Sequence, residues 1–346
     1  MTTAYVNSTS LLDWQRTLGT AARDVESPCG QALARIGAAI EQHPERIPLR
    51  DYVGLLESIG ERCRPSAIAW NVGLSVELPL GTDLGRAVLG CRSLGTALHW
   101  LCHYFPLLQD SACLRLDVDE DWTTLSYRIV DPTIWPRHED AMYTLGIYAR
   151  LIKAAAPEAW SQVQVTVEAE QDQVRADLDT IVNASVAYGG NANALRFPTS
   201  IINAPLNLAP PCDAAILKKL SAELTAKRRR APITDRTRQT IFREMNDGSV
   251  NQEHIARELG ISSRTLRRRL SEEGQSFQGL LDQCRMEFAA LEFRVRRKLS
   301  LSEMALRLGY SEHSTFSRAF ARWSGMAPQE YRRSIAVAED AGRRLS

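Results

Sequence analysis

Three arginines, Arg264, Arg267 and Arg268, follow one another at i, i+3 and i+4, so on a helix they share one face. Leu266 and Leu270 lie four residues apart and belong on the opposite face, toward a core. Outward-facing guanidinium groups are suited to bidentate contacts with O6 and N7 of guanine, each of which supplies about 1 to 3 kcal/mol of discrimination between bases. The competing interpretation is a merely solvated helix face, which is the usual fate of helical charge.

The segment that contains these arginines has a repeated pattern, found in residues 252–270 and again in residues 302–320. Each copy has a short helix with a small alanine, a Leu-Gly stop, a serine, and then a polar helix with at least one arginine. Gly260 and Gly309 fall where a helix must end in a left-handed residue. The serine two residues after each glycine is expected to cap the next helix. The pattern predicts two helix-turn-helix motifs, and its recurrence disfavours the solvated-face interpretation.

A long helix is predicted between the two copies, from Phe277 to about Lys298. Its apolar residues are Leu280, Leu281, Cys284, Phe288, Leu291 and Val295. A helix of this span is about 33 Å long, comparable with the roughly 34 Å between successive major-groove faces of B-DNA. The second helices of the two copies are therefore expected to enter successive major grooves, with bending of the DNA if their separation falls short of a full turn.

At these residues the chain resembles the AraC/XylS family of bacterial transcription regulators. The resemblance covers about the last hundred residues, and its most specific part is the Gly-x-x-Pro-x-x-Tyr-Arg of residues 325–332, preceded by residues 316–323. It implies that the exposed residues of the two second helices read bases, the three arginines first. The full set expected at DNA is Ser263, Arg264, Thr265, Arg267, Arg268, His313, Ser314, Ser317, Arg318 and Arg322.

The second copy differs from the first in the chemistry of its outer face. Phe316 and Phe320 take the buried places, and serine and histidine, which specify bases less well than arginine, take most of the exposed ones. The second motif is therefore expected to be the less selective reader. Two features depart from the family pattern: Tyr310 stands where the family usually has Phe, and the basic run of residues 296–298 offers additional phosphate contacts.

Charge is divided unevenly along the 346-residue chain. Residues 1–230 contain 22 Lys and Arg against 26 Asp and Glu, whereas residues 231–346 contain 20 against 15. The basic part is the one with the repeated motif, as an electrostatic footprint for DNA requires.

Other features of the composition indicate the compartment. The start of the chain lacks a secretion signal and no run of 18 uninterrupted apolar residues occurs, so a soluble cytoplasmic protein without membrane contact is expected. Seven cysteines without a C-x-x-C pair are expected to be buried thiols in a reducing compartment.

The first two thirds of the chain have mixed helical and strand patterns. Helices are predicted over residues 30–42, 49–63, 83–93, 94–108, 139–155 and 217–226, and strands over residues 113–118, 122–130 and 163–167. The first two strands flank an acidic turn and predict a hairpin. Because the order lacks regular β-α-β alternation, the expected fold is an α+β N-terminal domain followed by an all-α C-terminal domain with two helix-turn-helix motifs joined by a long helix.

About residues 47–211 are similar, in order and spacing, to the arabinose-binding-type N-terminal domain of the family branch that includes ornithine-utilisation regulators. The supporting stretches are residues 48–56, 83–85 and 194–198. The resemblance implies a domain that senses a small effector and dimerises.

The chain is accordingly divided into five parts. These are a tail (1–27), an effector-binding and dimerisation domain (28–212), a linker (213–235), a DNA-binding domain (236–335) and a second tail (336–346). The basic run of residues 227–232 in the linker is either a solvated hinge or a further phosphate contact.

A metal site is the first of two further possibilities. His99 and His103 stand at i, i+4, a spacing that chelates metal, but Trp100 replaces the glutamate that zinc hydrolases need after the first histidine. Cys102 could complete a structural or sensory site, although plain packing is the more common outcome. No metal, cofactor or catalytic residue is therefore predicted.

A small-molecule pocket is the second possibility. Its candidate lining is Trp70, Trp100, Tyr104, Trp122 and Trp135, with Arg128 or His138 as polar contacts. Aromatic residues at such spacings more often belong to a core, so no ligand-binding residue is assigned.

Together these residues predict a cytoplasmic, sequence-specific transcription regulator that is not an enzyme. Its expected partners are double-stranded DNA, a small-molecule effector, RNA polymerase and a second copy of the chain. One alternative is a regulator controlled by protein contacts or abundance alone. Another is an enzyme docked on DNA, such as the alkylation-repair proteins with a similar C-terminal region, which need close cysteine pairs that this sequence lacks.

Overall fold

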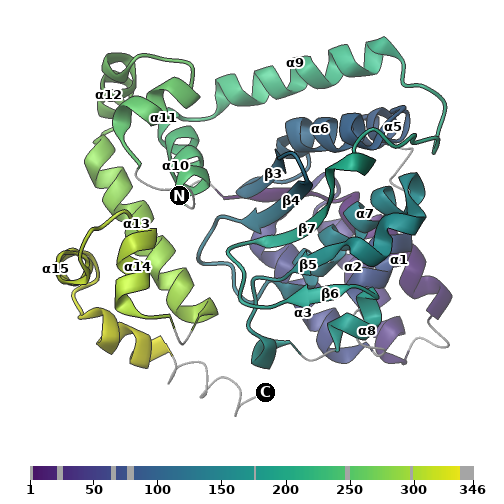
Figure 1. Ribbon diagram of the computed structural model, residues 1–346, viewed down its shortest axis with the longest axis horizontal. Coiled ribbons are helices and arrows are strands. Elements are labelled where there is room, and N and C mark those ends of the chain that lie inside the picture. Colours follow the sequence, from purple (N-terminus) through teal and green to yellow (C-terminus); the bar gives the residue numbers. More distant parts are fainter. Residues whose placement is uncertain are drawn as a thin grey trace. The chain divides into compact units, whose positions relative to one another are not determined.

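The computed structural model describes residues 3–21, 26–63, 68–75, 82–174, 177–245, 250–296 and 299–335. The chain, drawn as a ribbon in Figure 1, forms two compact units. Each unit has its own hydrophobic core. The first unit comprises Met1–Ile129 and Ile134–Arg229, and the second comprises Val130–Thr133 and Arg230–Ser346.

A five-stranded sheet lies in the first unit. Its strand order is β3 (Ala112–Val118), β4 (Trp122–Ile129), β7 (Asn193–Pro198), β5 (Gln164–Thr166) and β6 (Ser185–Ala187). The pairs are antiparallel except for β5 with β6, which are parallel. The hairpin of β3 and β4 is confirmed, and so is the mixed, α+β character of this part of the chain.

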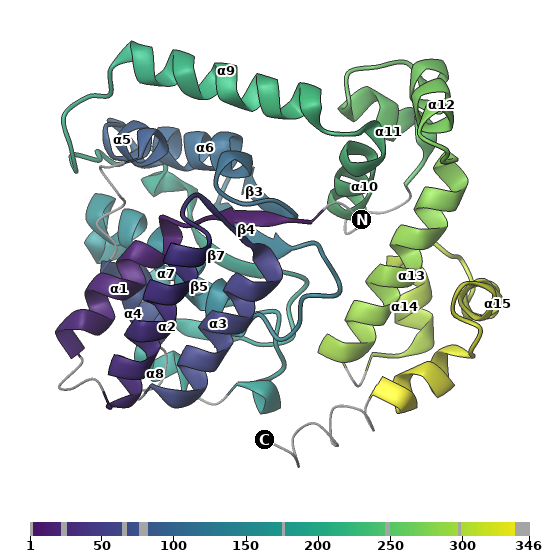
Figure 2. The same cartoon turned by 180° about the vertical axis from the view of Figure 1, so that it is seen from behind.

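Helices pack around this sheet, as Figures 1 and 2 show from opposite sides. They are α1 (Ser10–Ala21), α2 (Pro28–Gln42), α3 (Leu49–Arg62), α4 (Ile68–Ser75), α5 (Asp83–Leu89), α6 (Leu94–Tyr104), α7 (His138–Ala155), α8 (Leu178–Val182) and α9 (Ala214–Arg230). The shorter elements are β1 (Tyr5–Asn7), β2 (Arg46–Pro48) and the 3-10 turns η1 (Phe105–Leu107), η2 (Pro157–Gln162), η3 (Gln171–Gln173) and η4 (Thr199–Ile201).

Helix α7 is the central helix of the first unit and packs against α4, β4 and β7. Two glycines allow its close approach to α4. A Cβ on Gly73 would lie 2.2 Å from the carbonyl oxygen of Tyr143, and one on Gly146 would lie 2.6 Å from that of Trp70. Because no side chain fits at either position, this contact specifies glycine on both helices.

The expected N-terminal tail is wrong for residues 5–21. β1 pairs with β2 in an antiparallel arrangement, and α1 buries Leu11, Trp14 and Leu18 completely. These three residues recur at i, i+3 and i+7, which is the apolar stripe of a core-facing helix. The segment is therefore part of the first unit's core.

Residues 214–230 of the expected linker form α9, which contains the helix expected at residues 217–226 and is longer at both ends. Leu220 and Leu224 of this helix are buried in the core of the first unit. The basic run begins in its last turn, where Lys227 Nζ lies 2.6 Å from Asp110 Oδ1. The hinge interpretation therefore fails for residues 227–230, which continue a helix.

The described part of the second unit is helical. Its helices are α10 (Ile233–Glu244), α11 (Gln252–Glu258), α12 (Ser263–Glu272), α13 (Phe277–Val295), α14 (Leu301–Arg307) and α15 (His313–Ser324), and residues 328–335 are also helical. The expected all-α fold with two helix-turn-helix motifs and a long joining helix is confirmed. The joining helix α13 ends at Val295 instead of Lys298, and residues 297–298 of the basic run lie outside the described residues.

Candidate nucleic-acid interface

The first helix-turn-helix motif consists of α11 and α12 and has the predicted turn. Gly260 has a φ of +69°, which is the left-handed conformation that ends a helix. The Oγ of Ser262 accepts a hydrogen bond from the backbone N–H of Thr265 at 3.1 Å and so caps α12. Leu266 and Leu270 are completely buried, as predicted. The turn and the core together fix which face of α12 points outward.

The second motif consists of α14 and α15, and its turn is one residue longer. Gly309 has a φ of +78°, as predicted. The residue that precedes α15 is Glu312, however, and its side chain makes no capping hydrogen bond. The expected cap by Ser311 is therefore wrong, because the extra residue places this serine one position too early.

The outer face of α12 presents the three predicted arginines to solvent. Arg264, Arg267 and Arg268 are all exposed. Within the described chain, Arg264 and Arg267 have no hydrogen-bond or ion-pair partner. Arg268 Nη1 lies 2.9 Å from Oε1 of Glu272, in an exposed pair of the kind that contributes at most about 1 kcal/mol. Two guanidinium groups are thus free for a ligand and the third is weakly held.

The two remaining candidates on α12 are less accessible. Ser263 and Thr265 are half-buried. The Oγ1 of Thr265 lies 2.9 Å from the capping oxygen of Ser262, and the backbone oxygen of Ser263 accepts from the side chain of Gln252 at 3.1 Å. Both residues therefore take part in the turn itself.

The outer face of α15 carries the candidates of the second motif. His313, Ser314 and Arg318 are exposed, and Ser317 is half-buried. The Oγ of Ser314 donates to Glu312 at 3.2 Å. Phe316 and Phe320 are completely buried, as predicted.

Tyr310 and Arg322 contact the joining helix α13. Arg322 is exposed and lies 3.2 Å from Asp282 of α13. The guanidinium carbon of Arg285, also on α13, lies 4.9 Å from the ring centroid of Tyr310. The tyrosine that departs from the family pattern thus packs between the joining helix and α15, where its ring also lies 6.1 Å from that of Phe316.

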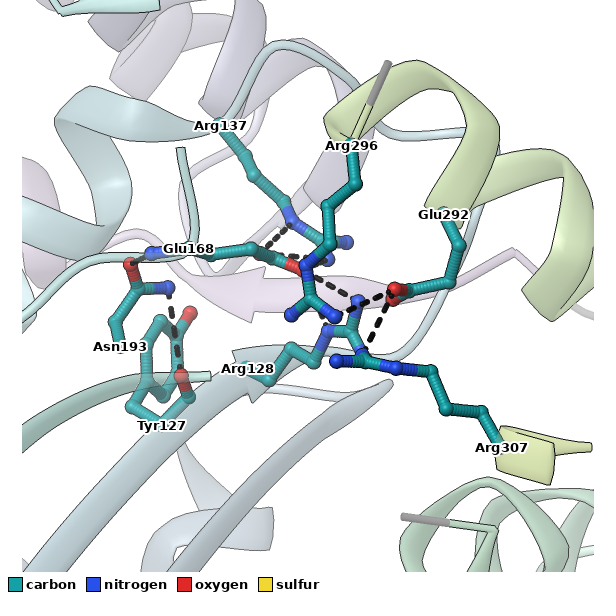
Figure 3. Close-up of polar contacts among 8 residues, drawn as sticks. All are labelled: Tyr127, Arg128, Arg137, Glu168, Asn193, Glu292, Arg296 and Arg307. Atoms are coloured by element: carbon teal, nitrogen blue, oxygen red, sulfur yellow. Dashed lines mark hydrogen bonds and ion pairs between the residues drawn. The ribbon is translucent and has the colours of Figure 1, made fainter. Parts of the chain in front are cut away.

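Ion pairs connect α13 to the helices on either side of it. Arg238 of α10 pairs with Glu287 of α13. Near the C-terminal end of α13, Glu292 lies 3.2 Å from Arg307 of α14 and 3.0 Å from Arg296. Figure 3 shows these residues. Because these side chains are largely withdrawn from water, the pairs restrict how the joining helix meets its neighbours.

A partly open cavity lies within the first unit, with about 740 Å³ of empty space including solvent at its mouth. Its wall is formed by α1, α3, α5, α6, α7 and the segments around them. Tyr52, Tyr143 and Tyr148 contribute aromatic surface, and Asp13 and Asp140 contribute carboxylates.

Comparison with known proteins agrees with this architecture. Residues 28–206 match the family described as the arabinose-binding domain of AraC transcription regulators, N-terminal, and residues 255–334 match a helix-turn-helix domain. An uncharacterised HTH-type transcriptional regulator from Mycobacterium tuberculosis is 35% identical over 260 residues, which cover 72% of this chain and 73% of that protein. This chain belongs to the AraC family of transcription regulators. Like its relatives, this AraC-family protein is a DNA-binding regulator of transcription.

Two further matches cover more of the chain. The ornithine utilization regulator of Pseudomonas aeruginosa is 27% identical over 305 residues, 86% of this chain and 88% of that protein. The crystal structure of the transcriptional regulator CdpR from P. aeruginosa aligns with 86% of this chain and 96% of that chain, at 21% identity and a TM-score of 0.37. Among the helices of the AraC-type chain that the structure describes, none combines the length and apolar character needed to cross a bilayer.

The pocket residues suggested by the sequence lie elsewhere in this AraC-family protein. None of the candidate tryptophans is among the described residues that line the cavity. Arg128 is instead buried beside Glu168, at 2.6 Å, together with Arg137 at 2.7 Å (Figure 3). Burial raises the pKa of Glu168, but the two guanidinium groups outweigh it and hold that pKa below its usual value.

The two histidines considered for metal binding stack on each other. The ring centroids of His99 and His103 lie 6.2 Å apart, and His103 packs edge-on against Tyr104. Among the residues with described positions, no group of three or more His, Cys, Asp or Glu side chains gathers closely enough to hold a metal ion.

Sequence reasoning missed the actual cavity, although one signal for it was present. Asp140, Tyr143, Thr144, Ile147 and Tyr148 stand at i, i+3, i+4, i+7 and i+8, so they line one face of α7. A polar and aromatic stripe on an otherwise buried helix indicates a cavity wall.

Proposed function

We propose that this regulator reads DNA bases with the outer faces of α12 and α15. The observation that carries the proposal is the pair of exposed, unpartnered guanidinium groups of Arg264 and Arg267, on a helix whose orientation is fixed by a capped turn and a buried leucine face. Arginine has the fork geometry for guanine, so a half-site with guanine is expected beneath α12. The weaker face of α15, with His313, Ser314, Ser317 and Arg318, reads the second half-site less strictly.

The exposed ion pairs fit this role. Arg268 and Arg322 are held only by solvent-exposed partners, Glu272 and Asp282, so either arginine can leave its carboxylate for a phosphate or a base edge at small cost. Ser263 and Thr265, which are engaged in the turn, contribute to DNA binding mainly by positioning α12 and by contacts to the backbone phosphates.

The length of the joining helix favours bent DNA. α13 has 19 residues, and a helix of that size is about 28 Å long, shorter than the roughly 34 Å that one turn of B-DNA requires. Simultaneous contact of both motifs with successive grooves therefore draws the duplex toward the protein, and flexible steps between the half-sites contribute to specificity.

We further propose that a small molecule bound in the cavity of the first unit changes DNA occupancy, and that the protein works as a cytoplasmic homodimer that contacts RNA polymerase. The match to the arabinose-binding domain of AraC regulators supports an effector, and a P. aeruginosa relative is named for control of ornithine utilization. Regulation by such a ligand requires that it bind two states of the protein with different affinity.

The direct test is selection of bound sites from a random DNA pool with the full chain, followed by titration of the selected site against random competitor at moderate salt. The expected result is a preference of at least 1000-fold with two half-sites about one helical turn apart. Binding that is equal for selected and random DNA would overturn the proposal.

A further inference from the structure

The cavity of the first unit is acidic. Asp13 of α1 and Asp140 of α7 both line it and are only 5% and 1% exposed. No Lys, Arg or His is among the described residues that form its wall. Asp13 is paired with Arg16 at 2.6 Å, outside the wall and half in solvent, so the second carboxylate is the one that lacks a counterion in the cavity.

Asp140 is held by neutral groups. Its Oδ2 accepts a hydrogen bond from the hydroxyl of Tyr127 at 2.5 Å, and that hydroxyl accepts from the amide of Gln109 at 2.8 Å. This chain of donors orients the carboxylate without neutralising it. Burial raises the pKa of Asp140 to about 6, with Tyr127 and Arg137 acting in the opposite direction. Arg137 pairs with Glu168 and is not among the lining residues, so the cavity wall itself offers Asp140 no cation. A cationic ligand in the cavity would lower the cost of burying this carboxylate.

Tyr148 gives an independent indication of a ligand. Its side chain lines the cavity and is 1% exposed, and its hydroxyl has no hydrogen-bond partner among the residues that the structure describes. Buried hydroxyls in folded proteins are nearly always hydrogen-bonded. Tyr148 lies two helical turns beyond Asp140 on the same face of α7.

Apolar side chains form much of the remaining wall, beside uncharged polar residues such as Thr144 and Gln109. Val88 of α5, Leu101 of α6, Phe105 and Ile147 provide hydrocarbon surface between the polar groups. A ligand that fills this space must have an apolar body. A carboxylate on the ligand would meet two aspartates and no cation, which disfavours free amino acids and other organic acids.

We propose that this cavity binds a small organic amine that carries an ammonium group and no carboxylate. The ammonium group lies at Asp140 and Asp13, the hydrocarbon body packs against the apolar wall, and a polar group at the far end bonds to the hydroxyl of Tyr148. This assignment rests on the proposed effector role of the first unit and specifies the class of effector.

The test compares matched skeletons on the full chain. Butylamine, hexylamine, 2-phenylethylamine, tyramine and tryptamine are each titrated by calorimetry beside the alcohol and the carboxylate of the same skeleton. At least one amine is expected to bind at least tenfold more tightly than both of its analogues. Absence of binding by every amine, or equal binding of an alcohol or carboxylate, would overturn the inference.

Variants locate the site. Asp140→Asn is expected to weaken the best amine at least tenfold, whereas Asp51→Asn, an exposed aspartate of α3, leaves binding unchanged. Tyr148→Phe is expected to weaken tyramine more than 2-phenylethylamine, because only tyramine has a hydroxyl to pair. If Asp140→Asn fails to fold in a melting experiment, the Tyr148→Phe comparison decides, and an equal effect on both amines counts against the inference.

The experiments distinguish an error in the ligand class from an error in the proposed effector role. A neutral or acidic compound that binds and changes DNA occupancy rejects the amine class but keeps the effector role. An amine that binds through Asp140 without changing occupancy of the selected DNA site keeps the assignment of the cavity and rejects the effector role.

Discussion

The carboxylate of Glu292 on α13 lies 3.2 Å from the guanidinium group of Arg307 on α14. Glu292 is completely buried and is also 3.0 Å from Arg296. The Glu292–Arg307 pair therefore connects the joining helix to the first helix of the second helix-turn-helix motif. Because the pair spans this junction, it restrains the angle at which the second motif leaves α13.

Replacing Arg307 by Met should destabilise this junction. The substitution keeps most of the side-chain volume but removes one of the partners of a buried carboxylate, so the free energy of unfolding is expected to fall by about 1 to 3 kcal/mol in urea denaturation. Arg257→Met, at an exposed position of α11, serves as the matched control and should change the free energy of unfolding by less than about 0.5 kcal/mol. Equal losses in the two variants would refute the structural role of the pair.

Replacing Arg264 by Ala should relax base preference at one position. A bidentate contact to guanine is worth about 1 to 3 kcal/mol, so the preference for that base should fall roughly 5-fold to 150-fold in competition binding while other positions are unchanged. Arg269, exposed on the same helix but turned away from Arg264, provides the control. Uniform weakening across all sequences in Arg264→Ala would instead identify a phosphate contact.

The two motifs should differ in selectivity. Arg268→Ala is expected to reduce affinity for the selected site more than Ser314→Ala, because arginine makes the stronger base contact and Ser314 already donates to Glu312. Gel-shift titrations of the two variants at the same salt concentration give the ranking. The reverse order would contradict the prediction that α15 is the less selective reader.

The turn of the first motif should tolerate asparagine better than alanine at Gly260. A Cβ at this residue would meet no atom within 4 Å, so any penalty comes from its φ of +69°. Gly260→Ala is expected to cost about 1 kcal/mol of unfolding free energy, and Gly260→Asn less, since asparagine populates the left-handed region more readily. Thermal melts of both variants beside the parent check the order, and an alanine variant as stable as the parent would show that the conformation is not costly.

Glu57 should make stability decrease with rising pH. Burial raises its pKa from 4.5 to about 8, and its Oε1 accepts a hydrogen bond from the backbone N–H of Glu139 at the start of α7. Since the folded state holds this proton more tightly than the unfolded state, the unfolding free energy falls as pH rises from about 4.5 to about 8.

Glu57→Gln keeps an acceptor oxygen but cannot titrate. Its free energy of unfolding should therefore match that of the parent at pH 5 and be higher by about 1 to 3 kcal/mol at pH 9, a range that allows for the partial exposure of the Glu57 side chain. Urea denaturation at pH 5, 7 and 9 measures the free energy of unfolding of the parent and of the variant. Parallel pH profiles for the parent and Glu57→Gln would mean that Glu57 does not titrate in this range.

The sequence predicted those features whose causes are local. The left-handed conformations of Gly260 and Gly309, the cap by Ser262 and the burial of Leu266 and Phe316 all depend on residues within one or two helical turns. The β3–β4 hairpin is local in the same sense. The misplaced cap at Ser311 shows the limit of such reasoning, because a one-residue difference in turn length moved the start of α15 without altering the motif's appearance.

The sequence by itself therefore determined the two helix-turn-helix motifs, the outward arginines of α12 and membership of a DNA-binding family. Only the tertiary structure decided that residues 10–21 form a core-packed helix, that the helix near residues 217–226 extends over 214–230 and packs in the first unit's core, and that Asp13 and Asp140 share a cavity. The reason is physical: helix periodicity and capping act between neighbours in the chain, whereas burial and the walls of a cavity depend on segments that meet only when the chain folds.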